Sequence, residues 1–412
     1  MKELLNFQKS SKASNELSVN IFINPKEYLI ATLLFFIIFG ISLSIKYIEF
    51  KQFSEFKTSY QKLFVENQYS KKDYFVLKLI TKDNFQFYSI SKERIINLRG
   101  FSIFANISIK KNFTFLDYLS SDFLYIRNIS LASNELDKRY RYSKEIFDEV
   151  HKNRKISELY SALFLATPIG KELREDLSRL GINHLAVLSG FHVSFIIGAI
   201  LLILLIIYKP IHKIFFPFRS FYRDSSIFAI IIISIYLMFL GTPSSFLRSV
   251  TMFIIAIFIF DRNLLKAKFE VLILAVVILI AFQPNLIFSV GFWFSVSGVF
   301  YILLYIKFFN FKKLDLILIN IWVFVAMIPI VHYIFPNFYF QQLLSPIWTI
   351  LFSIFYPISA ILHIIGFGDV FDAMLENFLS LDLGENYSFL TPNWFIILYL
   401  IFSIGLAFYK KD

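Results

Sequence analysis

The sequence contains no cysteine, so disulfide bonds, iron–sulfur clusters, thiolate nucleophiles and cysteine-based zinc sites are all excluded. Charge is also scarce. Asp, Glu, Lys and Arg make up 17% of the 412 residues, whereas an ordinary soluble protein has roughly 25%. Hydrophobic residues make up 57%, and this composition indicates a membrane protein rather than a soluble globular one.

The common catalytic motifs are missing as well. The sequence has no His-Glu-x-x-His, no His-x-His-x-Asp-His, no Gly-x-Ser-x-Gly and no glycine-rich phosphate loop that ends in Lys-Ser or Lys-Thr. Zinc-dependent hydrolysis, serine esterase chemistry and ATP hydrolysis therefore have no motif to support them. We expect no enzyme activity, no metal and no cofactor, and active transport would need an energy source outside this chain.

Long charge-free stretches are what the sequence has in abundance. A helix needs about 20 apolar residues to cross a bilayer core of about 30 Å. Stretches without Asp, Glu, Lys or Arg cover residues 28–45, 184–208, 227–247, 249–260, 271–306, 316–368 and 386–409. The stretch 271–306 is long enough for two passes, which we expect to separate near Gln283-Pro284-Asn285. The predicted fold class is a polytopic α-helical membrane protein.

Most of the charged residues lie in one long block and in a few short loops. Residues 46–157 hold 21 Lys and Arg against 13 Asp and Glu, a net charge of +8. Short basic segments favour the cytoplasmic side, and they occur at 209–223, 262–268, 307–313 and 410–411. We therefore predict a cytoplasmic segment (1–27), an uncleaved transmembrane anchor (28–48), a periplasmic domain (49–157), an amphipathic interfacial segment (158–183), a polytopic domain (184–409) and a cytoplasmic tail (410–412).

One acidic segment conflicts with a simple alternation of spans. Residues 369–385 carry acidic side chains and no Lys or Arg, which favours the outside, yet a full pass before them would place them inside. Residues 343–365 contain Pro346 and Pro357. We therefore expect 343–365 to be a re-entrant or broken hairpin rather than a span.

The periplasmic block has the residue alternation of a small β domain. Residues 74–80, 85–90 and 101–109 alternate apolar and polar side chains as strands do, and Asp83-Asn84 suits a hairpin turn. Residues 134–155 are expected to form a charged helix that leads to the membrane. These elements fit a small β-barrel inserted after the first transmembrane helix, either of the oligonucleotide-binding (OB) type or of another small β fold.

Basic residues alternate with aromatic ones in this block. Lys71, Lys72, Lys78 and Lys82 lie in a stretch that is rich in Tyr and Phe. Cations that hold phosphates, beside rings on which bases stack, suit a nucleic-acid strand. These four lysines are therefore candidate DNA-binding residues. The alternative is that the aromatic residues simply form the core of the domain.

Polar and small residues gather at three places: where the stretch 184–208 begins, at the break between 227–247 and 249–260, and within 271–306. Polar groups in a membrane are costly unless they face a cavity or one another, so these residues are candidates for a polar path: His184, Ser189, Gly190, His192, Ser245, Arg248, Gly291 and Ser295. Two simpler explanations compete with this one. The first is that Arg248 only reaches back to the membrane interface. The second is that the small residues around Gly291 only allow close helix packing.

The same stretches resemble the ComEC-type competence family, whose members are polytopic channels for transforming DNA. The family's run G-x-x-H-L-L-A-x-S-G-L-H is matched by Gly181, His184, Leu185, Ser189, Gly190 and His192. The family's S-x-x-R-A run is matched by Ser245 and Arg248. Its D-P-x(6)-G-F-Q-L-S-F run is matched by Pro284, Gly291, Phe292 and Ser295. A later run is matched by Pro329 and Phe335. Departures from the family pattern occur at Phe191, Ser249, Trp293 and Ser345.

The resemblance implies a multi-pass channel of the inner membrane that imports single-stranded DNA during natural competence. It implies single-stranded DNA, membrane lipid, a periplasmic DNA receptor and a cytoplasmic ATPase motor as partners, and a second copy of the chain is a further candidate. Longer members carry a C-terminal metallo-β-lactamase-like domain, whose motif this sequence lacks. We therefore expect a separate polypeptide to degrade the DNA.

Two other functions stay open at this point. An intramembrane hydrolase would use Ser189 as nucleophile with His184 or His192 as base. A transporter of a small solute or lipid precursor would use the β domain only as structure. In the DNA channel, broken helices would direct the partial positive charge of their N-termini at phosphates, and Arg248 would add one full charge.

Overall fold

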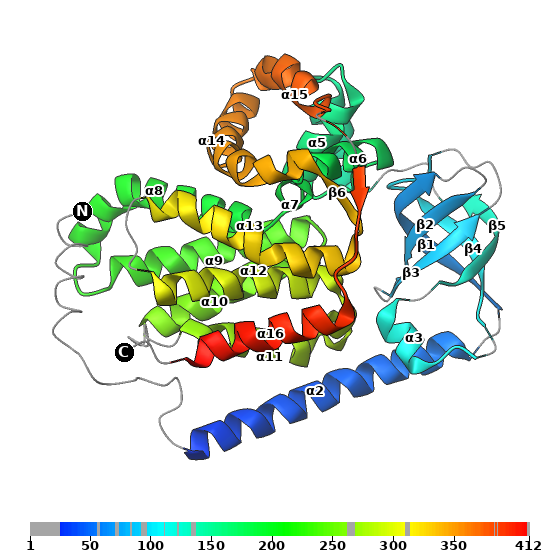
Figure 1. Ribbon diagram of the computed structural model, residues 1–412, viewed down its shortest axis with the longest axis horizontal. Coiled ribbons are helices and arrows are strands. Elements are labelled where there is room, and N and C mark those ends of the chain that lie inside the picture. Colours follow the sequence, from blue (N-terminus) through cyan, green and yellow to red (C-terminus); the bar gives the residue numbers. More distant parts are fainter. Residues whose placement is uncertain are drawn as a thin grey trace.

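The computed structural model describes residues 25–409 except 56–57, 71–73, 83–84, 92–96, 111, 122, 133–136, 262–267, 310–313, 383 and 385. Lys71, Lys72 and the predicted Asp83-Asn84 turn therefore lie outside the described residues. The described chain forms a bundle of long helices, a small β-sheet, and a group of shorter helices that lies beside both (Figure 1).

Apolar helices dominate the described chain, as predicted. Six of them are long and apolar enough to cross a membrane, judged by length and composition: Lys26–Ser54, Gly190–Phe215, Phe221–Phe239, Val290–Phe308, Ile317–Ile334 and Phe340–Ile364. Three shorter apolar helices cover Phe246–Ile257, Phe269–Phe282 and Asn393–Phe408. The protein is therefore a multi-pass membrane protein.

Most of these helices form an up-and-down bundle. Its members are α8 (Gly190–Phe215), α9 (Phe221–Phe239), α10 (Ser244–Asp261), α11 (Lys268–Phe282), α12 (Val290–Phe308), α13 (Asp315–Ile334) and α16 (Asn393–Phe408). Each packs against the next (Figure 1). The predicted break is confirmed, because Pro284 begins the short 3-10 helix η2 (Pro284–Phe288) between α11 and α12. At the bundle end away from the sheet, Lys307 Nζ donates to Ala407 O at 2.6 Å.

Five antiparallel strands form one sheet in the order β3-β2-β1-β4-β5. They are β1 (Thr58–Ser70), β2 (Phe75–Ile80), β3 (Gln86–Ser91), β4 (Ser102–Ser108) and β5 (Tyr125–Leu131), with the short helix α3 (Phe115–Ser120) between β4 and β5. A backbone bridge also joins Tyr88 of β3 to Phe123. Next to it, Leu124 N donates to Tyr88 O at 2.8 Å, so the two edges of the sheet approach each other.

Three of the five strands were visible in the sequence. The predicted strands 74–80, 85–90 and 101–109 are confirmed as β2, β3 and β4. The apolar alternation does not reveal β1, because its next inward position after Leu63 and Val65 is the buried Asn67. The alternation does not reveal β5 either, because Ile126 is the one buried position of that strand.

The anchor helix α2 (Pro25–Ser54) continues from the bundle into the sheet domain without a break (Figure 1). Phe50 and Phe53 pack against the core of the sheet. Tyr118 of α3 donates from its hydroxyl to Glu49 Oε2 at 3.3 Å. These contacts fix the sheet to the C-terminal end of the anchor helix.

The third part is a group of short helices that we call the outer helical unit. It contains α4 (Lys138–Ser143), the π-helix η1 (Lys144–Asp148), α5 (Arg154–Leu165), α6 (Lys171–Arg179), α7 (Asn183–Ala186), η4 (Gly368–Phe371) and α15 (Asp372–Leu379). The prediction of one charged helix over 134–155 is wrong. The helix ends after Asp148, and Asn153 starts a new one by accepting a hydrogen bond from Lys155 N at 2.9 Å.

Within the amphipathic segment predicted over 158–183, the helix α6 forms, and its apolar side packs against protein. Leu173, Leu177 and Leu180 are no more than 1% exposed. They lie in a core that the outer helical unit shares with Tyr356 of the next element, α14 (Ser345–Ile364). Protein therefore covers this apolar face, and the interfacial location of the segment stays a prediction.

Both ends of α14 contact the outer helical unit. At its start, Ser345 Oγ donates to Gly181 O at 2.9 Å. At its end, His363 Nε2 lies 3.1 Å from His151 Nε2. Length and composition alone would let this helix cross a membrane, but its contacts place both ends on the same side of the bundle.

The segments that flank α14 also meet each other. β6 (Asn337–Tyr339) precedes it, after which comes the 3-10 helix η3 (Phe340–Leu344), and β7 (Asn386–Ser388) follows it. β6 and β7 pair as antiparallel strands, with Asn337 opposite Ser388. The end of α13 and the start of α16 are thereby neighbours, which is the arrangement that a re-entrant segment between them requires.

Candidate functional site

The predicted polar stretches lie at the starts of α8, α10 and α12. All three helices start at the bundle end that faces the sheet and the outer helical unit (Figure 1). A Cβ added to Gly190 would lie 3.4 Å from Ser249 Oγ, so the starts of α8 and α10 touch. Arg139 of α4 donates to Leu240 O, just before α10, at 2.6 Å. The partial positive charges of three helix N-termini are therefore gathered at one end of the bundle.

Ser189 and His192 cap the start of α8. The Ser189 side chain accepts a hydrogen bond from the His192 backbone N–H, and His192 Nδ1 accepts one from Ser189 N at 3.1 Å. Because Nδ1 is an acceptor, the ring proton belongs on Nε2. Nε2 is buried and has no hydrogen-bond partner in the described chain. The His192 ring instead packs against Tyr356, with 4.6 Å between ring centroids.

This geometry favours capping over hydrolysis. Ser189 Oγ lies 3.1 Å from His192 Nδ1, but a catalytic His also needs a group that orients it. The other nitrogen of His192 meets no such group among the described residues. His184 lies exposed on α7, and the described hydrogen bonds of Ser189 go to His192 rather than to His184.

Arg248 reaches from the start of α10 to the start of α12. It is 4% exposed. Its Nη2 donates to Gly291 O at 3.0 Å, and its guanidinium lies 5.7 Å from the centroid of the Phe292 ring. Nε and Nη1 are buried without a hydrogen-bond partner in the described chain. Arg248 is therefore buried against α12, which favours a role inside the bundle over an arginine that reaches back to the interface.

The small residues of α12 are not required for close packing. A Cβ added to Gly291 or Gly298 would meet no atom within 4 Å, so the packing alternative does not explain them. Ser295 is half-buried one turn after Gly291. The side chain of Ser245, at the start of α10, lies outside the described part of the structure. The structure thus brings Arg248 together with Gly291, and Ser189 together with His192.

A family model described as "Competence protein" matches residues 167–410. This region is more than half of the 412-residue chain. The chain belongs to the competence protein family. The resemblance found in the sequence is confirmed, and the polar starts of α8, α10 and α12 all lie inside the matched region. Membership in the competence family supports a role in competence DNA uptake. No curated protein and no solved structure matches the chain.

The lysines proposed for DNA binding are only partly described. Lys78 forms an ion pair with Glu66, with 2.6 Å between Nζ and Oε2. Burial lowers the pKa of Lys78, but the charge and hydrogen bond of Glu66, together with Tyr88 and Tyr69, raise it, and the net pKa is above the ordinary value. Lys82 is exposed. Lys78 therefore has a partner within its own domain, which makes it a weaker candidate than Lys82.

A histidine pair, with His151 buried and His363 half-buried, joins α14 to the outer helical unit. His151 Nδ1 lies 2.9 Å from Asp372 Oδ1, and His151 Nε2 lies 3.1 Å from His363 Nε2. Burial raises the pKa of Asp372, although His151 opposes this shift. Sequence reasoning missed this cluster because His151 and His363 are distant along the chain. No group of three or more His, Asp or Glu side chains among the described residues is arranged to hold a metal ion.

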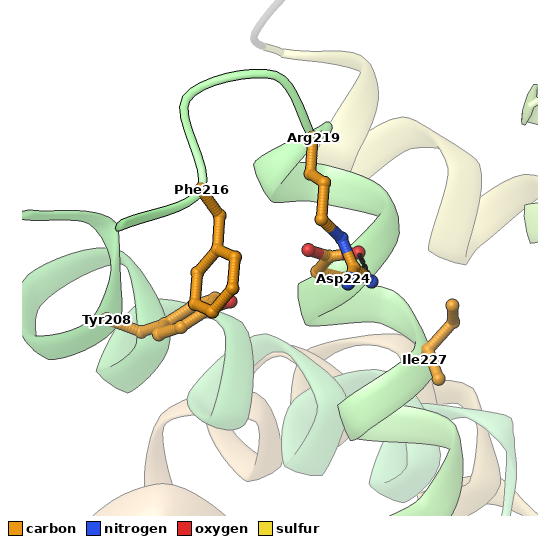
Figure 2. Close-up of a pocket in the computed structure, with 5 residues that line it drawn as sticks. All are labelled: Tyr208, Phe216, Arg219, Asp224 and Ile227. Atoms are coloured by element: carbon orange, nitrogen blue, oxygen red, sulfur yellow. Dashed lines mark hydrogen bonds and ion pairs between the residues drawn. The ribbon is translucent and has the colours of Figure 1, made fainter. Parts of the chain in front are cut away.

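A small cavity of about 150 Å³ lies at the other end of the bundle, in the loop between α8 and α9 (Figure 2). Tyr208 and Phe216 line one side of it, and Ile227 lines the other. Arg219 Nη2 and Asp224 Oδ1 form an ion pair of 2.9 Å within it. Its charges are thus already paired, and it is remote from the starts of α8, α10 and α12.

Proposed function

We propose that the chain is the inner-membrane channel through which single-stranded transforming DNA enters the cytoplasm. The observation that carries this proposal is the guanidinium of Arg248, which has two buried donors without a partner in the described chain. A buried, unsatisfied charged donor is costly. A phosphate that passed the starts of α8, α10 and α12 would accept these donors.

The charges at this site are of the right size for a moving polyanion. A helix N-terminus carries roughly half a positive charge, so three of them and one arginine supply about +2.5 against one or two phosphates. Conduction requires a site that attracts the ion and still releases it. One cation with three helix ends meets this need better than a continuous row of lysines, which would hold the strand.

The sheet domain is proposed to capture the strand before it reaches the bundle. We infer that the five strands close as an OB-like barrel. The order β3-β2-β1-β4-β5 and the backbone bridge between Tyr88 and Phe123 support this inference. OB-folds present a groove to oligonucleotides. The fixed contact between α2 and the sheet would hold such a groove next to the channel.

The proposed channel depends on other molecules for energy and delivery. The sequence has no nucleotide-binding loop motif, so a cytoplasmic ATPase motor would pull the strand. A periplasmic DNA receptor would deliver it, membrane lipid would surround the bundle, and a second copy of the chain is a further candidate partner.

Uptake of labelled DNA tests the proposal directly. In a deletion strain, complementation with the Arg248→Gln variant should leave label in the periplasm and cut cytoplasmic label at least tenfold. Arg127→Gln is the matched control, because Arg127 is exposed on β5 and belongs to none of the three helix starts, and it should import like the wild type. Membrane levels of each variant are compared by immunoblot. Normal cytoplasmic label in the deletion strain itself would refute the proposal and favour a small-solute transporter.

A further inference from the structure

A cavity of about 440 Å³ lies between the sheet and the outer helical unit. Ligand pockets in proteins typically measure roughly 300–1,000 Å³. Arg99 and Phe101 line it from the segment that leads into β4, and Tyr140 and Lys144 line it from α4 and η1. None of these residues belongs to the polar stretches at the helix starts, so the cavity is a separate site.

The cavity wall carries a surplus of positive charge. Four cations and two carboxylates line it: Arg99, Lys144, Lys152, Arg154, Asp148 and Glu158. Glu158 Oε1 pairs with both arginines, at 3.5 Å from Arg99 Nη2 and 3.4 Å from Arg154 Nε. Lys144 and Lys152 are exposed and form no ion pair with any described residue. These two lysines are the cations that an anionic ligand would meet first.

The start of α5 adds to the same positive region. α5 begins at Arg154, two residues after Lys152, and is 12 residues long. Its N-terminus therefore favours an anion. The hydroxyl of Ser157, in the first turn of α5, donates to Asp148 Oδ1.

Two aromatic rings line the cavity beside these cations. Tyr140 is fixed in place, because its hydroxyl donates to Glu66 O at 2.6 Å. Its ring also lies directly over Gly100, where an added Cβ would be 2.5 Å from Tyr140 Cγ. Gly100 has a φ of +80°, which also favours glycine. Phe101 supplies the second ring and is half-buried at the cavity wall.

We propose that this cavity binds one nucleotide of the incoming single strand. Its phosphate would lie at Lys144, Lys152 and the start of α5, and its base would stack on Phe101 or Tyr140. Positive side chains that hold the backbone, together with rings that accept bases of any sequence, are the usual means of binding a single strand. The proposal rests on the proposed function and moves the outer binding site from the predicted lysines to this cavity.

Fluorescence anisotropy with the purified full chain in lipid nanodiscs tests the phosphate contacts. The probe is a fluorescein-labelled oligothymidylate of eight nucleotides. The double variant Lys144→Gln/Lys152→Gln should bind it at least tenfold more weakly, and the slope of log affinity against log salt should fall by about 1.4, since each lost contact to a single strand removes roughly 0.7. The matched control is Lys51→Gln/Lys62→Gln, which removes two exposed lysines outside the cavity and should bind like the wild type.

An abasic oligonucleotide of the same length tests the base contacts. It should bind the wild type about 5- to 150-fold more weakly than oligothymidylate, because stacking of one base contributes about 1–3 kcal/mol. Phe101→Leu should reduce this preference, with its melting temperature as the check on folding. Equal affinity for both probes, or a loss in the control double variant instead, would overturn the proposal.

The two proposals fail in different ways. If the wild type supports DNA uptake but Lys144→Gln/Lys152→Gln binds oligothymidylate normally, the cavity proposal is wrong and the channel stands. If the chain binds oligothymidylate through these lysines but its deletion leaves uptake intact, the channel proposal is wrong and the nucleotide site stands.

Discussion

Arg248 and Gly291 join two helix starts through one hydrogen bond, in which Nη2 of Arg248 donates to the Gly291 carbonyl at 3.0 Å. Gly291 stands in the first turn of α12, where backbone N–H groups lack helix partners. A single positive side chain therefore lies between α10 and α12 where helix dipoles already favour anions. An apolar residue in place of Arg248 therefore distinguishes two roles. If Arg248 serves transport, the replacement abolishes import and keeps the fold; if Arg248 serves folding, the replacement destabilises the protein.

Arg248→Met should preserve the fold and abolish DNA import. Methionine is apolar and of similar length, so it removes two unpaired donors, whose burial costs about 1–3 kcal/mol each. It also loses the bond to Gly291, which contributes about 1.5–3 kcal/mol as a bond to a charged group. The gain from removing the donors offsets the lost bond, so the melting temperature of the purified protein should not fall by more than a few degrees. A large drop in melting temperature would show that Arg248 is mainly structural.

Ser189→Gly should retain DNA import, whereas Ser189→Ala should lower stability. Glycine costs only a few tenths of a kcal/mol at a helix N-cap, and alanine costs about 0.5–2 kcal/mol. A nucleophilic serine would be lost equally in both variants. Import and melting temperature, measured side by side, therefore distinguish a cap from a catalyst. Complete loss of import in a stable Ser189→Gly protein would revive the hydrolase interpretation.

The sequence predicted the membrane part more accurately than the outer domain, for a physical reason. A span is a local property of about 20 residues, and a break such as Pro284 is marked by the residue itself. A strand such as β1 depends on pairing with β2 and β4, and its polar outward positions hide it. The protein cover of α6 was hidden for a similar reason, since amphipathicity shows that a face is covered and does not show whether lipid or protein covers it.

The candidate site also has parts that the sequence revealed and parts that it did not. The residues of the three helix starts could be selected from sequence because polar groups are rare in apolar stretches. The unpaired donors of Arg248 could not, because they depend on which helices surround them. The pair His151 and His363 and the cavity at Lys144 and Lys152 were also hidden, since both form between segments that are distant along the chain.

The ion pair of Lys78 and Glu66 should make the sheet domain sensitive to alkaline pH. The folded pKa of Lys78 lies above its ordinary value of 10.5, so pairing stabilises the fold fully below that value and less as the pH rises through the folded pKa. The difference in melting temperature between the wild type and Lys78→Met should therefore be larger at pH 8 than at pH 11. A constant difference across this range would show that the charge of Lys78 does not contribute.

The acidic segment after α14 should lie on the same side of the membrane as the sheet. β6 pairs with β7, and a single crossing between them would separate the two strands, so α14 should enter and leave on one side. The chain has no cysteine, which makes an introduced one the only site for a maleimide. In intact spheroplasts, a membrane-impermeant maleimide should label Ser380→Cys as readily as Lys62→Cys on β1. Ser220→Cys, in the loop between α8 and α9, should react only after permeabilisation. If Ser380→Cys behaved like Ser220→Cys, α14 would be a full span, and the pairing of β6 with β7 could not persist in the membrane.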